Sequence, residues 1–179
     1  MSTLIVENGD GIEGADAYVP VDYMVTYAAQ YGLPWSPTSV EAGDAAIRRA
    51  TTWLDARYRK YYSGERVYGR EQGLEWPRRD AYDADGNLIP IDVVPIEVQR
   101  STCEAASREL TTPGTLAPTV TPGRVIKSAA VSGAVSVTYS DDTTVQGQLP
   151  VVTVIDDIMG GLIDVSSAGV TGVIWKLRA

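Results

Sequence analysis

One stretch decides the fold class: Thr38-Ser-Val-Glu-Ala-Gly-Asp-Ala-Ala-Ile-Arg-Arg-Ala-Thr-Thr-Trp-Leu-Asp-Ala-Arg-Tyr58. Thr38 and Glu41 have capping-box spacing, which is typical of a helix start. Apolar side chains then recur at helical spacing and form one stripe. The stripe consists of Ile47, Ala50, Leu54 and Tyr58, and it is widened by Ala46 and Trp53. We therefore expect a long amphipathic helix that packs in the core.

Two further helices flank this one. The first is predicted over Val21 to Tyr31, because Pro20 suits a first helical turn and Gly32 with Pro34 stops it. Another runs from about Pro95 to Leu110 and has a face of small residues that allows close packing. Residues 61–94 form a connection that is too long for a plain turn, so we expect it to have local structure or a binding role.

The second part of the chain has the Val-, Thr-, Ser- and Gly-rich composition of strands and turns. A hairpin is predicted from about Val125 to Val131, through a Ser132-Gly133 turn, to a strand in which Val135, Val137 and Tyr139 share a face. Pro150 opens a short helix through Met159. In the last segment Val173, Trp175 and Leu177 alternate with Ile174 and Lys176, which predicts a strand.

These elements predict an α+β protein with a small helical bundle core, a β-hairpin appendage, a short fourth helix and a C-terminal strand. The core covers residues 1–116, the linker and hairpin 117–149, and the short helix with the strand 150–179. The C-terminal strand either pairs with a neighbouring chain, which we favour, or joins the hairpin of its own chain. Its alternation suits both arrangements.

Composition argues against common enzyme chemistry. The 179 residues include no histidine and one cysteine, and the net charge is -8. The chain therefore lacks the histidine of catalytic triads and of histidine metal sites, and it cannot form an intrachain disulfide. We expect no catalytic activity and no cofactor. The acidic balance also disfavours a protein that wraps DNA by general positive charge.

Acidic pairs and the cysteine offer only weak signals of a site. Asp83-Ala-Asp85-Gly86 resembles part of a calcium loop but lacks the other ligands, so an acidic turn is favoured. For Asp141-Asp142 and Asp156-Asp157 we favour solvated charges at a turn or a helix start over a Mg²⁺ site. Cys103 is interpreted as a small core residue.

The sequence predicts neither export nor membrane insertion. Residues 1–14 carry three acids and no base, which is the reverse of a signal peptide. No apolar run approaches the roughly 20 residues that span a bilayer. We therefore expect a soluble protein made in a reducing cytoplasm.

Positive charge gathers in one segment. Residues 57–79 hold seven bases against three acids, whereas the flanking parts are both acidic. The bases are Arg57, Arg59, Lys60, Arg66, Arg70, Arg78 and Arg79, interleaved with Tyr58, Tyr61, Tyr62 and Tyr68. Arginine with aromatic residues is typical of a protein interface or a nucleic-acid groove, and a solvated loop is the bland alternative. We favour the interface.

Several motifs in order resemble a known family. They begin with Val6-Glu-Asn-Gly-Asp-Gly-Ile-Glu-Gly-Ala-Asp-Ala-Tyr18, and the most specific pair is Leu74-Glu-Trp-Pro-Arg78 with Ile91-Asp-Val-Val-Pro95. This order is similar to that of phage head–tail connector (adaptor) proteins, many of which carry the label "DnaT-like putative single-stranded DNA-binding protein". The likeness covers most of the chain and is weaker near its C-terminus.

The resemblance implies a structural virion protein, made in the host cytoplasm and located at the head–tail interface. It would form a homo-oligomeric ring, usually dodecameric, below the portal protein and would bridge the portal to the next connector or tail protein. Duplex DNA would pass through the acidic lumen without specific binding, and no membrane is involved. The label implies the alternative, a single-stranded nucleic-acid-binding module that uses the segment from Arg57 to Arg79.

The residues expected to serve these roles fall into two sets. Interface residues are Arg57, Arg59, Arg66, Arg70, Arg78, Val135, Val137, Tyr139, Val173, Trp175 and Leu177. Trp76 and Pro77 are expected to anchor the basic segment on the helical core, because they give it a rigid apolar element.

Overall fold

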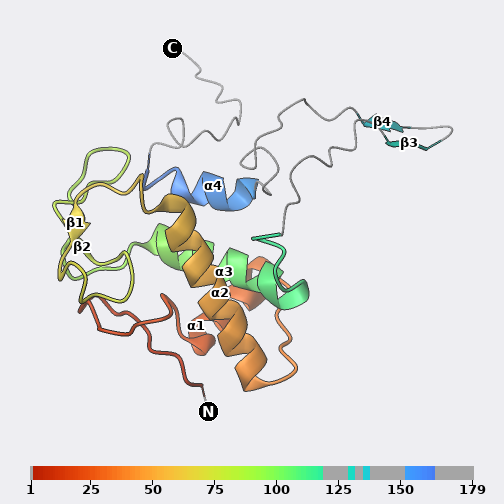
Figure 1. The fold of residues 1–179 in the computed structure, drawn as a ribbon, viewed down its shortest axis with the longest axis horizontal. Coiled ribbons are helices and arrows are strands. Elements are labelled where there is room, and N and C mark those ends of the chain that lie inside the picture. The colour runs from red at the N-terminus through yellow and green to blue at the C-terminus, as the bar shows by residue number, and fades with distance from the viewer. Residues whose placement is uncertain (1, 119–128, 132–134, 138–151, 164–179) are drawn as a thin grey trace.

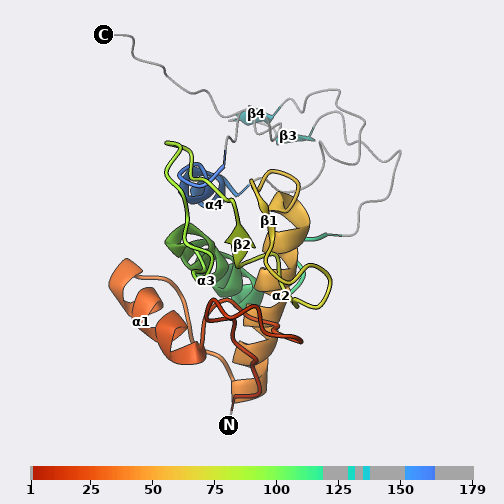
Figure 2. The same ribbon diagram turned by 90° about the vertical axis from the view of Figure 1, so that its left-hand side faces the viewer.

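The computed structural model describes residues 2–118, 129–131, 135–137 and 152–163. In this part the chain is mostly helical (Figure 1). Its helices are α1 (Val21–Tyr31), α2 (Val40–Tyr58), α3 (Ile96–Thr111) and α4 (Thr153–Met159). Helices α2 and α3 lie side by side at the centre, with α1 and α4 on opposite sides of them (Figures 1 and 2).

The boundaries of α1, α2 and α3 agree closely with the sequence pattern, with one correction at the start of α2. The N-cap is Ser39 rather than Thr38, because the Ser39 hydroxyl accepts a hydrogen bond of 3.2 Å from the backbone N–H of Ala42. Both residues offer a hydroxyl, so only the backbone conformation decides which of them caps the helix. Helix α1 ends at Gly32, whose φ of 68° is the left-handed conformation that glycine adopts without strain.

The core forms mainly where α2 packs on α3, the most extensive contact between two elements. Ile47, Ala50 and Leu54 of the predicted stripe are fully buried. On α3, Ala105 and Ala106 are equally buried, so the two helices approach closely. The small residues that the sequence indicates on α3 are therefore part of this core.

The long connection has local structure, as expected. Its strands β1 (Glu65–Arg66) and β2 (Arg78–Arg79) pair in antiparallel register. Between them, the buried Gln72 side chain donates to the carbonyl oxygens of Leu74 (2.9 Å) and Pro77 (3.0 Å). The loop between β1 and β2 therefore has a fixed shape.

The hairpin is present as β3 (Ala129–Val131) paired antiparallel with β4 (Val135–Val137). The predicted extensions to Val125 and Tyr139 and the predicted strand of residues 173–177 lie outside the described residues. Helix α4 begins at Thr153, three residues after the predicted start at Pro150. None of the helices in the described residues is long and apolar enough to cross a membrane.

Trp76 lies in the core with 1% of its surface exposed, and its ring meets the Tyr62 ring edge-on at 5.4 Å between centroids. We predict that Trp76→Ala lowers the free energy of unfolding by about 3–5 kcal/mol, because it leaves a large cavity. Urea denaturation measures the change. Tyr82→Ala, at a half-exposed aromatic position, serves as the control and should cost less than about 1 kcal/mol. Equal losses would contradict the prediction.

Candidate nucleic-acid interface

The bases of residues 57–79, the basic segment, do not form one continuous charged surface. Arg78 does not contribute to any such surface, because it is buried. Its side chain is 7% exposed. The guanidinium donates to the carbonyl oxygens of Ser63 (2.8 Å) and Gly64 (2.6 Å) and pairs with the Glu75 carboxylate at 3.1 Å. Arg78 therefore stabilises the connection from inside, and its charge does not face a partner as the sequence prediction required.

Arg57 is also held within the fold. Its guanidinium pairs with the Asp156 carboxylate of α4 at 3.3 Å and lies over the Trp53 ring, 5.6 Å from the centroid. The Tyr58 hydroxyl donates to the same carboxylate. Asp156 is 4% exposed, so the prediction of a solvated charge is wrong for it: the carboxylate attaches α4 to the end of α2.

Four bases of residues 57–79 have no ion-pair partner among the described residues: Arg59, Lys60, Arg66 and Arg70. Arg79 pairs at the surface with Glu65 at 2.8 Å across the β1–β2 ladder. Of the four, Arg66 is half-buried and the others are exposed. These are the cations that the fold leaves available to a ligand.

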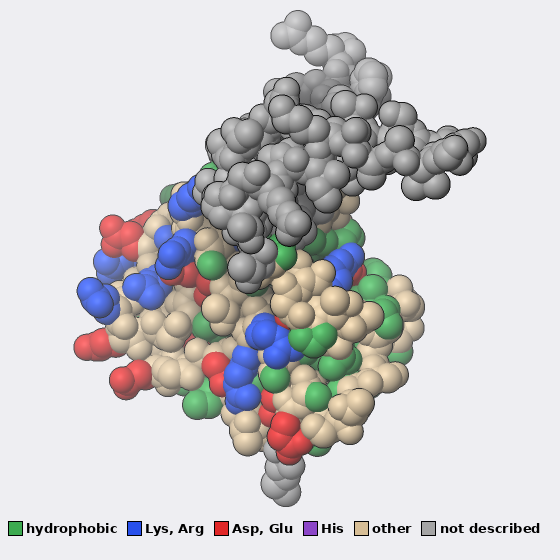
Figure 3. All heavy atoms as spheres, turned by 45° about the vertical axis from the view of Figure 1, so that its right-hand side comes forward, with side chains coloured by type: hydrophobic (Ala, Val, Ile, Leu, Met, Phe, Trp, Pro, Cys, Tyr) green, Lys and Arg blue, Asp and Glu red, His purple; other side chains and the backbone are tan. Residues whose placement is uncertain are grey.

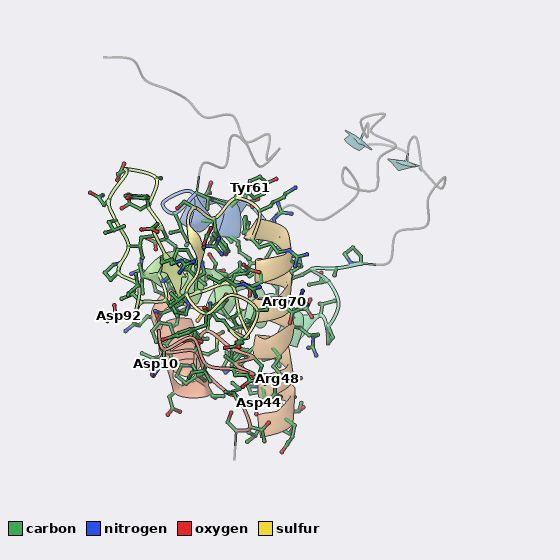
Figure 4. The ribbon with its side chains drawn as sticks, turned by 60° about the vertical axis from the view of Figure 1, so that its left-hand side comes forward. Asp10, Asp44, Arg48, Tyr61, Arg70 and Asp92 are labelled. Carbon is green, nitrogen blue, oxygen red and sulfur yellow. The ribbon has the colours of Figure 1, made fainter. Side chains whose placement is uncertain are left out.

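The four bases lie in two groups. Arg59 and Lys60 follow the end of α2, where the Lys60 ammonium lies 4.9 Å from the centroid of the Tyr61 ring. Arg66 and Arg70 belong to the loop between β1 and β2. Figure 4 shows Tyr61 near the end of α2 and Arg70 well separated from it along the helix. Although the four bases are close in sequence, they therefore do not form one basic patch on the surface.

The loop group, which we call the basic loop, consists of Arg66, Tyr68 and Arg70. Tyr68 is 54% exposed and its ring lies directly on Gly11, where a Cβ atom would come within 2.2 Å of the ring. A hollow of about 510 Å³ adjoins the loop. It is lined by Glu13, Gly14, Arg66, Arg70, Glu71, Gln72 and Gly73. The loop thus presents two cations and an aromatic ring beside a concave surface.

Acidic groups limit the positive potential of this region. Glu13 and Glu71 line the same hollow as the two arginines. On the face shown in Figure 3, basic and acidic side chains are interspersed. An anion is therefore favoured by individual arginines and not by a broad positive field. Two of the segment's tyrosines, Tyr58 and Tyr62, are buried and do not contribute to this surface.

The other predicted interface residues lie mostly beyond the described part. Val135 and Val137 belong to β4. Tyr139, Val173, Trp175 and Leu177 lie outside the described residues, so their interface role stays a prediction.

The candidate metal and cysteine sites of the sequence do not take shape in the described residues. No group of three or more His, Cys, Asp or Glu side chains there is placed to hold a metal ion. Cys103 is buried, and burial raises the pKa of its thiol to about 12, so it lacks the thiolate that a nucleophile needs. The Asp83 carboxylate accepts hydrogen bonds from the N–H groups of Asp85 and Asn87, which makes an acidic turn.

Sequence reasoning missed a polar network that places the basic segment on the bundle. The Asp55 carboxylate of α2 accepts hydrogen bonds from the Tyr18 hydroxyl (2.6 Å) and the Glu75 N–H (3.1 Å). The Trp76 N–H donates to the Tyr18 hydroxyl at 3.3 Å. The network thus joins the N-terminal segment, α2 and the connection. Only the position of Asp55 at the edge of the apolar stripe signals this role.

Comparison with known proteins gives one match. A family model described as "Putative DnaT-like ssDNA binding protein" matches residues 2–178, which is nearly the whole chain. No curated protein and no solved structure matches this chain.

The Asp55 network makes stability depend on pH. Loss of contact with water raises the pKa of Asp55 to about 7, although its hydrogen bonds favour the charged form. The folded protein therefore binds this proton more tightly than the unfolded chain, so the contribution is present at low pH and is lost as pH rises through 7. We predict that the wild type loses stability relative to Asp55→Asn between about pH 5 and about pH 8. Urea denaturation of both proteins across this range measures the difference in their free energies of unfolding. A difference that does not change with pH would contradict the prediction.

Proposed function

Because the chain belongs to the family described as "Putative DnaT-like ssDNA binding protein", we propose that it binds single-stranded DNA through the basic loop, assisted by Arg59 and Lys60. The observation that carries this proposal is that Arg66 and Arg70 line one hollow, while the exposed Tyr68 lies between them in sequence. Arginines bind backbone phosphates, and an exposed aromatic ring gives a base a face on which to stack. Neither step requires catalysis.

The fixed shape of the loop supports this role. The Gln72 side chain holds the loop from inside, and Gly11 lies against the Tyr68 ring. Binding of a DNA strand here would therefore require little ordering of the protein backbone. About half of the Tyr68 surface stays exposed and could stack on one base, so the loop would favour unpaired bases over the stacked bases of a duplex.

The charge balance predicts weak and salt-sensitive binding by a single chain. Four available cations neutralise at most four phosphates, which gives a slope of log K against log salt of about -3 for a single strand. The net charge of -8 opposes the approach of any polyanion. Binding should therefore be clearest at low salt.

We predict that Arg70→Glu weakens binding of an oligo-dT strand by about tenfold and lowers the salt slope by about 0.7, because one phosphate contact is lost. Fluorescence anisotropy at several salt concentrations measures both quantities. The matched control is Arg100→Glu on α3, which reverses another exposed arginine without an ion pair among the described residues and should change binding little. Equal effects of the two variants, or no binding by the wild type, would overturn the proposal.

We also propose, as a second function, a structural role in a phage head–tail connector ring. The specific observation is charge: a subunit of net charge -8 repeated around a ring gives an acidic lumen through which duplex DNA passes without sticking. The resemblance of the ordered motifs supports the same role. In the two most specific motifs, Trp76, Pro77, Val94 and Pro95 are buried, so their pattern reflects a shared fold. The portal protein and the next connector would be the partners.

The second function predicts a closed ring of this chain, formed alone or on a portal ring, that electron microscopy of the purified proteins detects. Virions made without this protein should contain heads that are not joined to tails. Normal joining in its absence would exclude the connector role and would leave DNA binding unaffected. The two functions are thus tested separately.

A further inference from the structure

An unusual number of exposed apolar side chains lies between β2 and the first turn of α3. Their exposed fractions run from 38% to 61%. They are Tyr82, Leu88, Ile91, Val93 and Ile96, and we call them the apolar strip. Single exposed apolar residues are ordinary, but here Tyr82 and Leu88 are paired across a β-bridge, and Ile91, Val93 and Ile96 follow within the next eight residues. This concentration of exposed apolar groups in one segment is a candidate for a covered surface.

The strip is exposed although its backbone is firmly held. Tyr82 and Leu88 face each other across an antiparallel bridge, and the Ile89 N–H donates to the Ala81 carbonyl oxygen at 2.8 Å. Further along, the Asp92 backbone lies against Gly9, where a Cβ atom would come within 1.9 Å of the Asp92 carbonyl oxygen. Figure 4 shows Asp92 on the same side of the molecule as Asp10 of that N-terminal loop. These backbone contacts keep the side chains of the strip at the surface.

The chain after α4 begins beside this strip. The Ala84 N–H donates to the Gly161 carbonyl oxygen at 3.1 Å, so the end of α4 lies against the loop of Tyr82 and Leu88, as Figure 2 also shows. Leu162 and Ile163 are buried and fix the point from which residues 164–179 depart. Nine residues separate Ile163 from Val173, which span up to about 30 Å when extended.

The last residues of the chain complement the strip chemically. Residues 173–178 read Val-Ile-Trp-Lys-Leu-Arg, three large apolar groups of one alternating face together with two cations. Residues 80–99 contain five acids and no base: Asp80, Asp83, Asp85, Asp92 and Glu97. Apolar and charged groups thus match in both segments, and the tether holds them at high effective concentration.

We propose that residues 173–178 bind the apolar strip of their own chain, with Trp175 and Leu177 on the strip and Lys176 and Arg178 toward its acids. The tether beside Ala84 is the reason to choose the same chain over a second copy, and this proposal replaces the pairing with a neighbouring chain that the sequence alone favours. The contact hides apolar surface that a partner protein would otherwise meet. This inference does not depend on DNA binding.

Disulfide trapping tests the contact with all strip residues kept. The variant Asp85→Cys/Ala179→Cys places one thiol beside the strip and one at the end of the chain, while the native Cys103 is buried and unreactive. In oxidised glutathione we expect a monomeric product with an intrachain disulfide, identified by peptide mass spectrometry. Adding Leu88→Ser and Ile91→Ser should slow its formation by about tenfold, because the tether is unchanged and only the apolar contact is lost.

Trp175→Ser in the same background should slow trapping to a similar degree. Leu88 and Ile91 are exposed, so their substitution leaves the described core intact. Circular dichroism of every variant checks that the helices persist. An intrachain rate that these substitutions leave unchanged would overturn the proposal, because the tether alone would then explain trapping. Disulfide-linked dimers as the main product would also overturn it, since the strip would then receive the segment of a second copy.

Discussion

The close contact between α2 and α3 is the constraint on which the rest of the structure depends. Ile47, Ala50 and Leu54 of α2 and the small residues Ala105 and Ala106 of α3 belong to the same core, and all five are fully buried. Small side chains let the two backbones approach, so any larger residue on this face of α3 would separate the helices or strain the core. Helices α1 and α4 both pack on α3, and neither has the length to be stable alone. Their positions therefore follow from this one contact.

The segments without regular structure are attached to this bundle by carboxylates. Asp44 of α2 accepts a hydrogen bond from the Thr3 N–H at 2.7 Å. Glu7 holds the N-terminal segment itself in shape, because it accepts bonds from the N–H groups of Gly9, Gly11 and Ile12. Glu109 binds the N–H groups of Gly114 and Leu116 in the same way. A carboxylate accepts several hydrogen bonds at once, which suits it to a loop whose N–H groups converge. Part of the acidic excess is therefore structural: the buried acids are Glu7, Asp44, Glu104, Glu109 and Asp156.

Sequence pattern predicted the helices well, because periodicity, prolines and glycines act within a few residues. The first helix was predicted at its observed bounds, and the start of α2 differed only in the choice between neighbouring hydroxyls. The site was less predictable. Arg57 and Arg78 looked like surface charges until the structure placed their partners, and Asp156 lies 99 residues from Arg57 in the chain. Charge alone does not distinguish a solvated group from a buried, paired one, since that depends on contacts remote in sequence.

The two proposed functions are linked by the small number of available cations. The basic segment of one chain has four of them in two separate groups, which would limit it to weak contact with a single strand. The proposed ring would repeat both groups at fixed spacing, so contacts that are weak singly would add along one strand without any new interaction. The same repetition would multiply the net charge of -8, which would repel DNA wherever arginines do not face it. In such an assembly, whether DNA is held or released would depend on which surface faces the strand: the basic loop would attract it, and the acidic remainder would repel it.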